Sequence, residues 1–166
     1  MARQLSAPQA LAALRIAVGV LFVIFGESKV FNNWFTSEGG FQVAINAMLQ
    51  HGATYPFMVG ALKNLVLPNA HFLAYLVAYS ELAIGLSLVS GILVRTASVG
   101  SALYMALLIC SASYPGEHVA FWRYFGSALE HLVLLLCFVT FAVSDSAEKW
   151  SIPSSRWWLS RTTPQP

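Results

Sequence analysis

Residues 72–113 have the sequence FLAYLVAYSELAIGLSLVSGILVRTASVGSALYMALLICSAS. Two apolar runs, residues 72–93 and 96–113, are separated only by Val94 and Arg95. Each run is close to the roughly 20 residues that an α-helix needs to cross a hydrocarbon core about 30 Å thick. The stretch therefore predicts two antiparallel membrane-spanning helices that form a tight hairpin.

Two further apolar runs flank this hairpin, residues 10–31 before it and residues 124–143 after it. Residues 32–71 are too polar to span a membrane, but they carry apolar residues at helical spacing. Gly52 is placed where one helix would end, and Pro56 fits the first turn of the helix that follows. We predict one or two short helices there, lying on the membrane surface or capping the bundle, with an irregular loop as the alternative. The predicted fold class is all-α, an integral membrane four-helix bundle with these short surface-lying helices between its first and second spans.

The composition argues against a soluble protein and against several kinds of site. Hydrophobic residues make up 57% of the chain and charged residues only 10%, whereas soluble domains carry about 25% charged residues. A formal charge of +2 is too small for a nucleic-acid-binding surface. The chain has two cysteines and lacks a Gly-rich phosphate loop, a C-x-x-C motif and a haem-attachment motif. We expect no metal, no built-in cofactor and no nucleic-acid partner.

The distribution of lysine and arginine predicts the orientation of the chain. We expect one transmembrane domain over residues 1–150 and a polar C-terminal tail over residues 151–166. With four spans, both termini lie on one side, which holds five positive residues against three on the other. The five are Arg3, Arg95, Lys149, Arg156 and Arg161. This predicts a multi-pass protein of the cell membrane with cytoplasmic termini and with residues 32–71 outside the cytoplasm.

Four ionisable side chains lie inside the apolar runs, namely Arg15, Glu81, Glu130 and His131. Such groups are costly in hydrocarbon, so each needs a partner and suggests a function. Steps of three and four residues put each of these stripes on one face of a helix, together with small residues. We expect these faces to point into the bundle interior. The stripes are Arg15-Gly19-Phe22-Gly26-Lys29, Ala74-Ala78-Glu81-Gly85 and Arg123-Ser127-Glu130-Leu134-Cys137.

Two carboxylates at similar depth in one apolar interior are not both expected to be ionised. We therefore expect Glu81 or Glu130 to be protonated and the other to pair with Arg15 or His131. Two interpretations of this network stay open. Either it handles protons or binds a ligand, or it is a buried polar network that only fixes which helices pair.

Three positive residues are predicted on the extracytoplasmic side, and we call Lys29, Lys63 and Arg123 the outer-face cations. Together they would form a cationic mouth that attracts an anionic substrate or lipid head groups. Anchoring of single side chains at the membrane interface is the alternative for each of them.

Five short motifs are informative together: LRIAVG at residues 14–19, GESK at 26–29, Pro68-Asn69, ELAIGLSL at 81–88 and GILVR at 91–95. They resemble the first span, the second span and the following turn of the DoxX family of membrane proteins. Trp34 and the GGF at residues 39–41 are similar to the DoxD-like branch, named for a subunit of thiosulfate:quinone oxidoreductase. The resemblance covers about residues 11–150.

The resemblance implies a four-helix membrane subunit of a quinone-linked redox system. In this hypothesis Glu81 and Glu130, assisted by His131 and Arg15, line an intramembrane pocket and exchange protons with a quinone. The expected partners are membrane lipid, a quinone and other protein subunits. A non-catalytic accessory subunit packed against a larger membrane complex is the alternative, and a small transporter is a third one.

Overall fold

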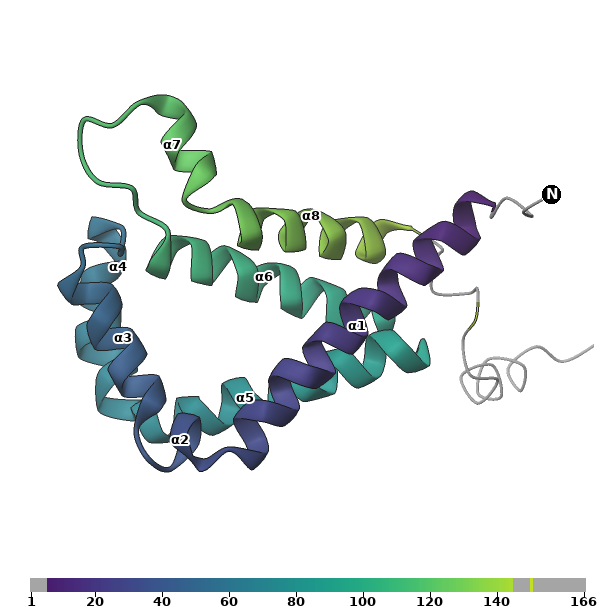
Figure 1. The fold of residues 1–166 in the computed structure, drawn as a ribbon, viewed down its shortest axis with the longest axis horizontal. Coiled ribbons are helices and arrows are strands. Elements are labelled where there is room, and N and C mark those ends of the chain that lie inside the picture. Colours follow the sequence, from purple (N-terminus) through teal and green to yellow (C-terminus); the bar gives the residue numbers. More distant parts are fainter. Residues whose placement is uncertain (1–5, 145–149, 151–166) are drawn as a thin grey trace, which may run out of the picture.

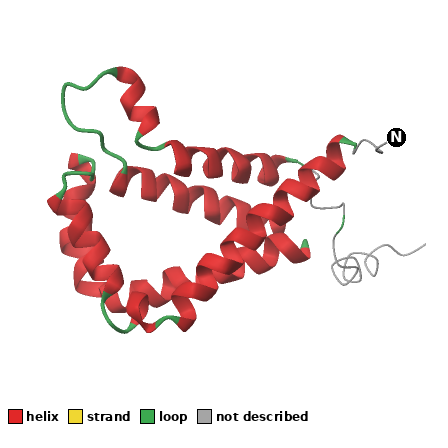
Figure 2. Cartoon of the chain, viewed as in Figure 1, coloured by secondary structure: helices red, strands yellow, loops and turns green. Residues whose placement is uncertain are grey.

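The computed structural model describes residues 6–144 and Trp150, and the regular structure in these residues is entirely helical (Figure 2). This confirms the predicted all-α class. The long helices are α1 (Ala7–Phe31), α5 (Ala70–Ser90), α6 (Val94–Ala112) and α8 (Leu129–Val143). The shorter ones are α2 (Asn33–Thr36), α3 (Gly40–Gln50), α4 (Pro56–Ala61), the π-helical η1 (Leu62–Val66), the 3-10-helical η2 (Leu67–Asn69) and α7 (Phe121–Gly126).

Three helices among the described residues are long and apolar enough to cross a membrane. They are α1, α6 and the continuous helical segment Pro56–Ser90, which contains α4, η1, η2 and α5. The chain is therefore a membrane protein. The fourth predicted span is divided into α7 and α8, and α8 has 15 residues, which is about 22 Å of helix. A crossing by α8 stays a prediction.

The first helix packs along α5, and glycines make this approach close (Figure 1). A Cβ atom on Gly26 would lie 2.5 Å from the backbone nitrogen of Leu82, and one on Gly85 would lie 2.5 Å from that of Val23. Gly19 is similarly tight against Leu88. Small residues let membrane helices approach to backbone contact, so the predicted stripes of the first and second spans do face each other.

The second helix pair is α6 with α8 (Figure 1). Phe138 and Phe141 of α8 are fully buried, and they form a cluster with Met105 of α6. Phe22 of α1 meets Phe138 edge to face, with ring centroids 5.2 Å apart. This aromatic contact connects the two helix pairs.

The stripe predicted for the fourth span is wrong, because Arg123, Ser127 and Glu130 are all exposed. The helix is interrupted between Gly126 and Leu129, so residues on the two sides of this break do not share one helical face. On α8 the buried side chains are Phe138 and Phe141, and these large rings rather than small residues fill the interior.

Residues 91–93 form the turn between α5 and α6. Gly91 and Leu93 have left-handed backbone conformations, with φ of +78° and +54°. Val94 and Arg95, predicted as the turn, already belong to α6. The predicted short connection is confirmed, but the tight hairpin is not. From the turn the two helices diverge, and α5 packs mainly on α1 instead (Figure 1).

Residues 32–71 close the open side of the two diverging pairs (Figure 1). They form helices, as predicted, with Gly52 at φ +64° just after α3 and Pro56 as the first residue of α4. Backbone hydrogen bonds join this segment to the end of α6, from Tyr55 N–H to the Cys110 carbonyl (3.0 Å). The Thr54 hydroxyl donates to the Ser111 carbonyl (2.7 Å).

Some of the predictions fall on residues outside the described part of the chain. These residues are Arg3, Lys149, Arg156, Arg161 and the tail 151–166. The predicted orientation and the predicted boundary of the tail therefore stay predictions.

Candidate functional site

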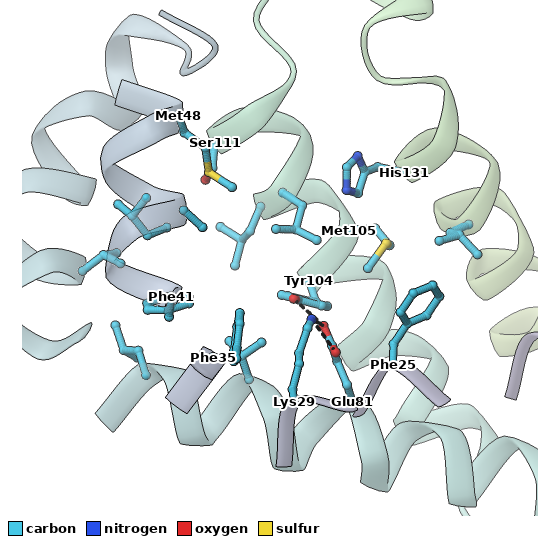
Figure 3. A pocket seen from close by; sticks show the side chains of 18 of the residues that line it. Phe25, Lys29, Phe35, Phe41, Met48, Glu81, Tyr104, Met105, Ser111 and His131 are labelled. Atoms are coloured by element: carbon cyan, nitrogen blue, oxygen red, sulfur yellow. Dashed lines mark hydrogen bonds and ion pairs between the residues drawn. The ribbon is translucent and has the colours of Figure 1, made fainter. Parts of the chain in front are cut away.

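A cavity of about 500 Å³ lies between the two helix pairs and the helices of residues 32–71 (Figure 3). Its wall is formed by side chains of α1, α2, α3, α4, η1, α5, α6 and α8. Most of the described residues that line it are aliphatic, aromatic or methionine. The polar ones are Lys29, Glu81, Tyr104, Ser111 and His131. A mainly apolar cavity with a few placed polar groups is typical of a small-molecule site.

Three of these polar side chains form one contact group, the Lys29–Glu81–Tyr104 cluster (Figure 3). The Lys29 ammonium lies 2.6 Å from each carboxylate oxygen of Glu81, and the Tyr104 hydroxyl donates to Glu81 Oε1 at 2.8 Å. Glu81 is only 5% exposed. Helices α1, α5 and α6 each supply one member, so the cluster also connects the two helix pairs.

The cluster is electrically balanced, which explains how an acidic residue is kept in an apolar interior. A buried carboxylate is tolerated when an opposite charge and further hydrogen bonds replace its lost hydration. An ammonium has three N–H donors, so Lys29 keeps a donor beyond the two contacts to Glu81. The Lys29 ammonium also lies 4.9 Å from the centroid of the Phe35 ring, within range of a cation–π contact.

This geometry corrects the predicted role of Lys29 as an outer-face cation. Its charge is neutralised by Glu81 on the cavity wall, so it does not form a common positive surface with Lys63 and Arg123. Lys63 on η1 and Arg123 on α7 are exposed, and neither lines the cavity. The Arg123 guanidinium lies 5.8 Å from the ring of its neighbour Trp122.

The predicted shared interior for Glu81 and Glu130 is also wrong. Glu130 lies in the first turn of α8, and its side chain is 83% exposed. His131 is the neighbour that lines the cavity, since consecutive helical residues point about 100° apart. The two residues are still in proximity, with His131 Nδ1 3.8 Å from Glu130 Oε1. Within residues 6–144, His131 Nδ1 is buried and makes no hydrogen bond.

Arg15 is fully buried, as expected for the α1 stripe, but it does not pair with Glu81. It precedes Lys29 by fourteen residues, or about 21 Å of helix. Its Nη2 donates to the carbonyl of Trp150 at 3.5 Å. Arg15 therefore belongs to the other end of α1, away from the cavity.

Sequence reasoning missed Tyr104 and the pairing of Lys29 with Glu81. Lys29 was already on the α1 stripe, three residues after Gly26, and Gly26 packs against Leu82, the neighbour of Glu81. An antiparallel alignment of the glycines in the first two spans would have indicated this pair. Tyr104 was missed because no stripe was predicted for the third span, although it lies three residues after the buried Ser101, on the same face of α6.

Aromatic side chains pack together where α4 begins. The rings of Tyr55 and Tyr114 lie 4.9 Å apart, and the Tyr114 N–H donates to the Ala53 carbonyl (2.8 Å). Burial raises the pKa of the Tyr55 hydroxyl, and the nearby Tyr124 and Cys110 raise it further. Tyr55 therefore stays neutral at physiological pH and contributes packing rather than charge.

A family model for DoxX matches residues 10–113, which is more than half of the 166 residues. The matched part includes α1 to α6 without the first turn of α1, and thus all three members of the Lys29–Glu81–Tyr104 cluster. No curated protein and no solved structure matches the chain. On the family match, the chain belongs to the DoxX family.

Proposed function

We propose that the chain is a membrane subunit of a quinone-linked oxidoreductase, and that its cavity binds the ring of a quinone. DoxX proteins are membrane proteins that are often linked to oxidoreductase-related functions. The likeness to the DoxD-like branch supports the same class. The observation that carries the proposal is the Lys29–Glu81–Tyr104 cluster on the wall of an apolar cavity among helices that can span a membrane.

A quinone fits the chemistry of this cavity. Its ring is apolar, and its two carbonyl oxygens accept hydrogen bonds from donors on opposite sides of the ring. The Lys29 ammonium is a donor for one oxygen. His131 lies elsewhere on the cavity wall (Figure 3) and is the donor for the other.

Reduction of the quinone takes two electrons and two protons and yields the quinol. A redox partner subunit supplies the electrons in this proposal. Lys29 supplies a proton to the near oxygen and becomes a neutral amine. The Glu81 carboxylate keeps the hydrogen bond from the Tyr104 hydroxyl and favours the return of a proton from water to Lys29. His131 supplies the second proton, and the exposed Glu130 carboxylate, 3.8 Å from His131 Nδ1, returns one from the surface. Oxidation of a quinol runs through the same groups in reverse.

The first prediction is that Glu81→Gln weakens quinone binding at least tenfold, or about 1.4 kcal/mol. The substitution keeps the shape of the side chain but leaves the Lys29 ammonium without a counter-ion in the cavity. The measurement is a titration of the purified protein in lipid nanodiscs with a prenylated benzoquinone, followed by tryptophan fluorescence. Glu27→Gln is the matched control, because Glu27 is exposed on α1 and does not line the cavity.

A second variant guards against a simple loss of folding. In Lys29→Met with Glu81→Leu both charges are replaced by apolar groups, which is often neutral for stability. We expect this double variant to fold and to bind the quinone weakly. Wild-type protein that binds no quinone, or a double variant that binds it as tightly as the wild type, contradicts the proposed function.

The alternative is a non-catalytic accessory subunit of a larger membrane complex, and helix α7 favours it. Phe121, Trp122 and Phe125 are all exposed on this short helix, which extends beyond the helix pairs (Figure 1). Extraction from native membranes in mild detergent separates the two hypotheses. A stable large assembly that forms without any effect on quinone turnover supports the accessory role.

A further inference from the structure

The cavity has a thin wall between α1 and α8. Helix α1 packs along α5 and α6 packs along α8, but α1 and α8 contact each other sparsely. Their edge-to-face contact is Phe22 with Phe138. Beyond it the C-terminal end of α1, which carries Lys29, diverges from the N-terminal end of α8, which carries His131 (Figure 1).

Leu21 and Phe25 form the α1 side of this thin wall. Both line the cavity, and they are 49% and 58% exposed. In a membrane span, exposed side chains face lipid acyl chains. The cavity therefore borders the bilayer at Leu21 and Phe25. Leu134 and His131 of α8 line the other edge.

The size of the cavity limits what it can enclose. About 500 Å³ is within the range of pockets for drug-sized ligands. This volume accommodates a substituted ring with the first part of a chain. A long isoprenoid chain does not fit, so its remainder must leave through the wall.

We infer that the ligand of this cavity carries a lipid tail, which passes between α1 and α8, beside Leu21 and Phe25, into the bilayer. This inference rests on the proposed function, because it specifies the class of quinone. The ring lies against the Lys29–Glu81–Tyr104 cluster, and the ligand enters and leaves sideways, without passing through water. Burial of each methylene in lipid is favourable, so a tail that stays in the bilayer keeps this stabilisation.

The test is Leu21→Trp, which narrows the passage from the lipid side. The probes are a benzoquinone with a polyprenyl chain and the same ring with only a methyl group, each added to the full chain in nanodiscs. We expect the affinity for the prenylated quinone to fall at least tenfold, because its tail no longer fits the passage, and the affinity for the methyl analogue to fall less. Ile24→Trp is the matched control, since Ile24 is 54% exposed on α1 and does not line the cavity.

A second variant, Phe25→Ala, widens the passage and is expected to speed association of the prenylated quinone. If Leu21→Trp lowers the affinity for both probes equally, or for neither, the passage for the tail is overturned while quinone binding stands. If neither probe binds to the wild type, the proposed function itself fails. Thermal unfolding of each variant in the same nanodiscs shows whether the fold is kept.

Discussion

Tyr104 gives the Glu81 carboxylate a hydrogen bond that comes from a different helix pair. Its hydroxyl lies 2.8 Å from Glu81 Oε1, while Lys29 contacts both oxygens from α1. A hydrogen bond to a charged group contributes about 1.5–3 kcal/mol. At the residue scale, Tyr104 is therefore a link between α5 and α6 as well as a member of the cavity wall.

We predict that Tyr104→Phe lowers the free energy of unfolding by about 1.5–3 kcal/mol. The substitution removes only the hydroxyl, so the apolar packing of the ring is retained. The measurement is unfolding in detergent micelles with a titrated denaturing detergent. Tyr79→Phe is the control, because Tyr79 is exposed on α5 and outside the cavity. An equal effect of the two substitutions would mean that the Tyr104 hydrogen bond adds no stability.

The sequence was informative about single charged residues but not about their partners. Glu81 was correctly placed on an interior stripe, and Arg15 was correctly expected to be buried. The partner of Glu81 depends on how far α1 slides along α5, and this register is set by glycine contacts that a hydropathy pattern does not contain. The exposure of Glu130 depends on where α8 begins.

At the scale of elements, the close contact of α1 and α5 depends on glycine. The Cβ of an alanine at Gly26 would lie 2.5 Å from the Leu82 nitrogen, closer than non-bonded atoms approach, so the two helices have to move apart. The Lys29 to Glu81 distance depends on the same approach, because Lys29 lies one turn after Gly26.

We predict that Gly26→Ala destabilises the protein by about 1–3 kcal/mol, the usual cost of an overpacked interior. Gly100→Ala is the control, since Gly100 is on α6 and a Cβ there meets no atom within 4 Å. That change is expected to be neutral or slightly stabilising, because alanine favours a helix over glycine. Thermal unfolding of both variants in the same detergent is the measurement. A stable Gly26→Ala variant would contradict the packing described for α1 and α5.

The break between α7 and α8 shows why the stripe predicted for the fourth span was wrong. Residues 124–143 form one apolar run, and nothing local but Gly126 indicates an interruption. In the structure the Ser127 hydroxyl donates to the carbonyl of Ser113 at 2.6 Å. This contact comes from the loop after α6, so it depends on the tertiary structure and not on the apolar pattern.

At the scale of the whole molecule, the cavity follows from the way the long helices pair. Length and hydropathy predicted the helices, and small residues predicted which faces of the first and second spans are buried. A short turn between α5 and α6 suggested that these two helices pack together. They diverge instead, because α1 offers α5 a glycine-lined surface and α8 offers α6 two phenylalanines. The space between the pairs is the cavity.

The shortness of α8 has a consequence for the surrounding lipid. Its 15 residues span about 22 Å, less than the roughly 30 Å of an average hydrocarbon core. If α8 crosses the bilayer, acyl chains beside it have to compress, at a fraction of a kcal/mol per ångström of hydrophobic mismatch.

We therefore expect a higher midpoint of thermal unfolding in bilayers of 14-carbon lipids than in bilayers of 18-carbon lipids. Equal midpoints would mean that α8 does not experience the full bilayer thickness. With a mismatch, the DoxX chain would gather in the thinner regions of a mixed membrane. Its passage for a lipid-tailed ligand would then open where acyl chains are most disordered.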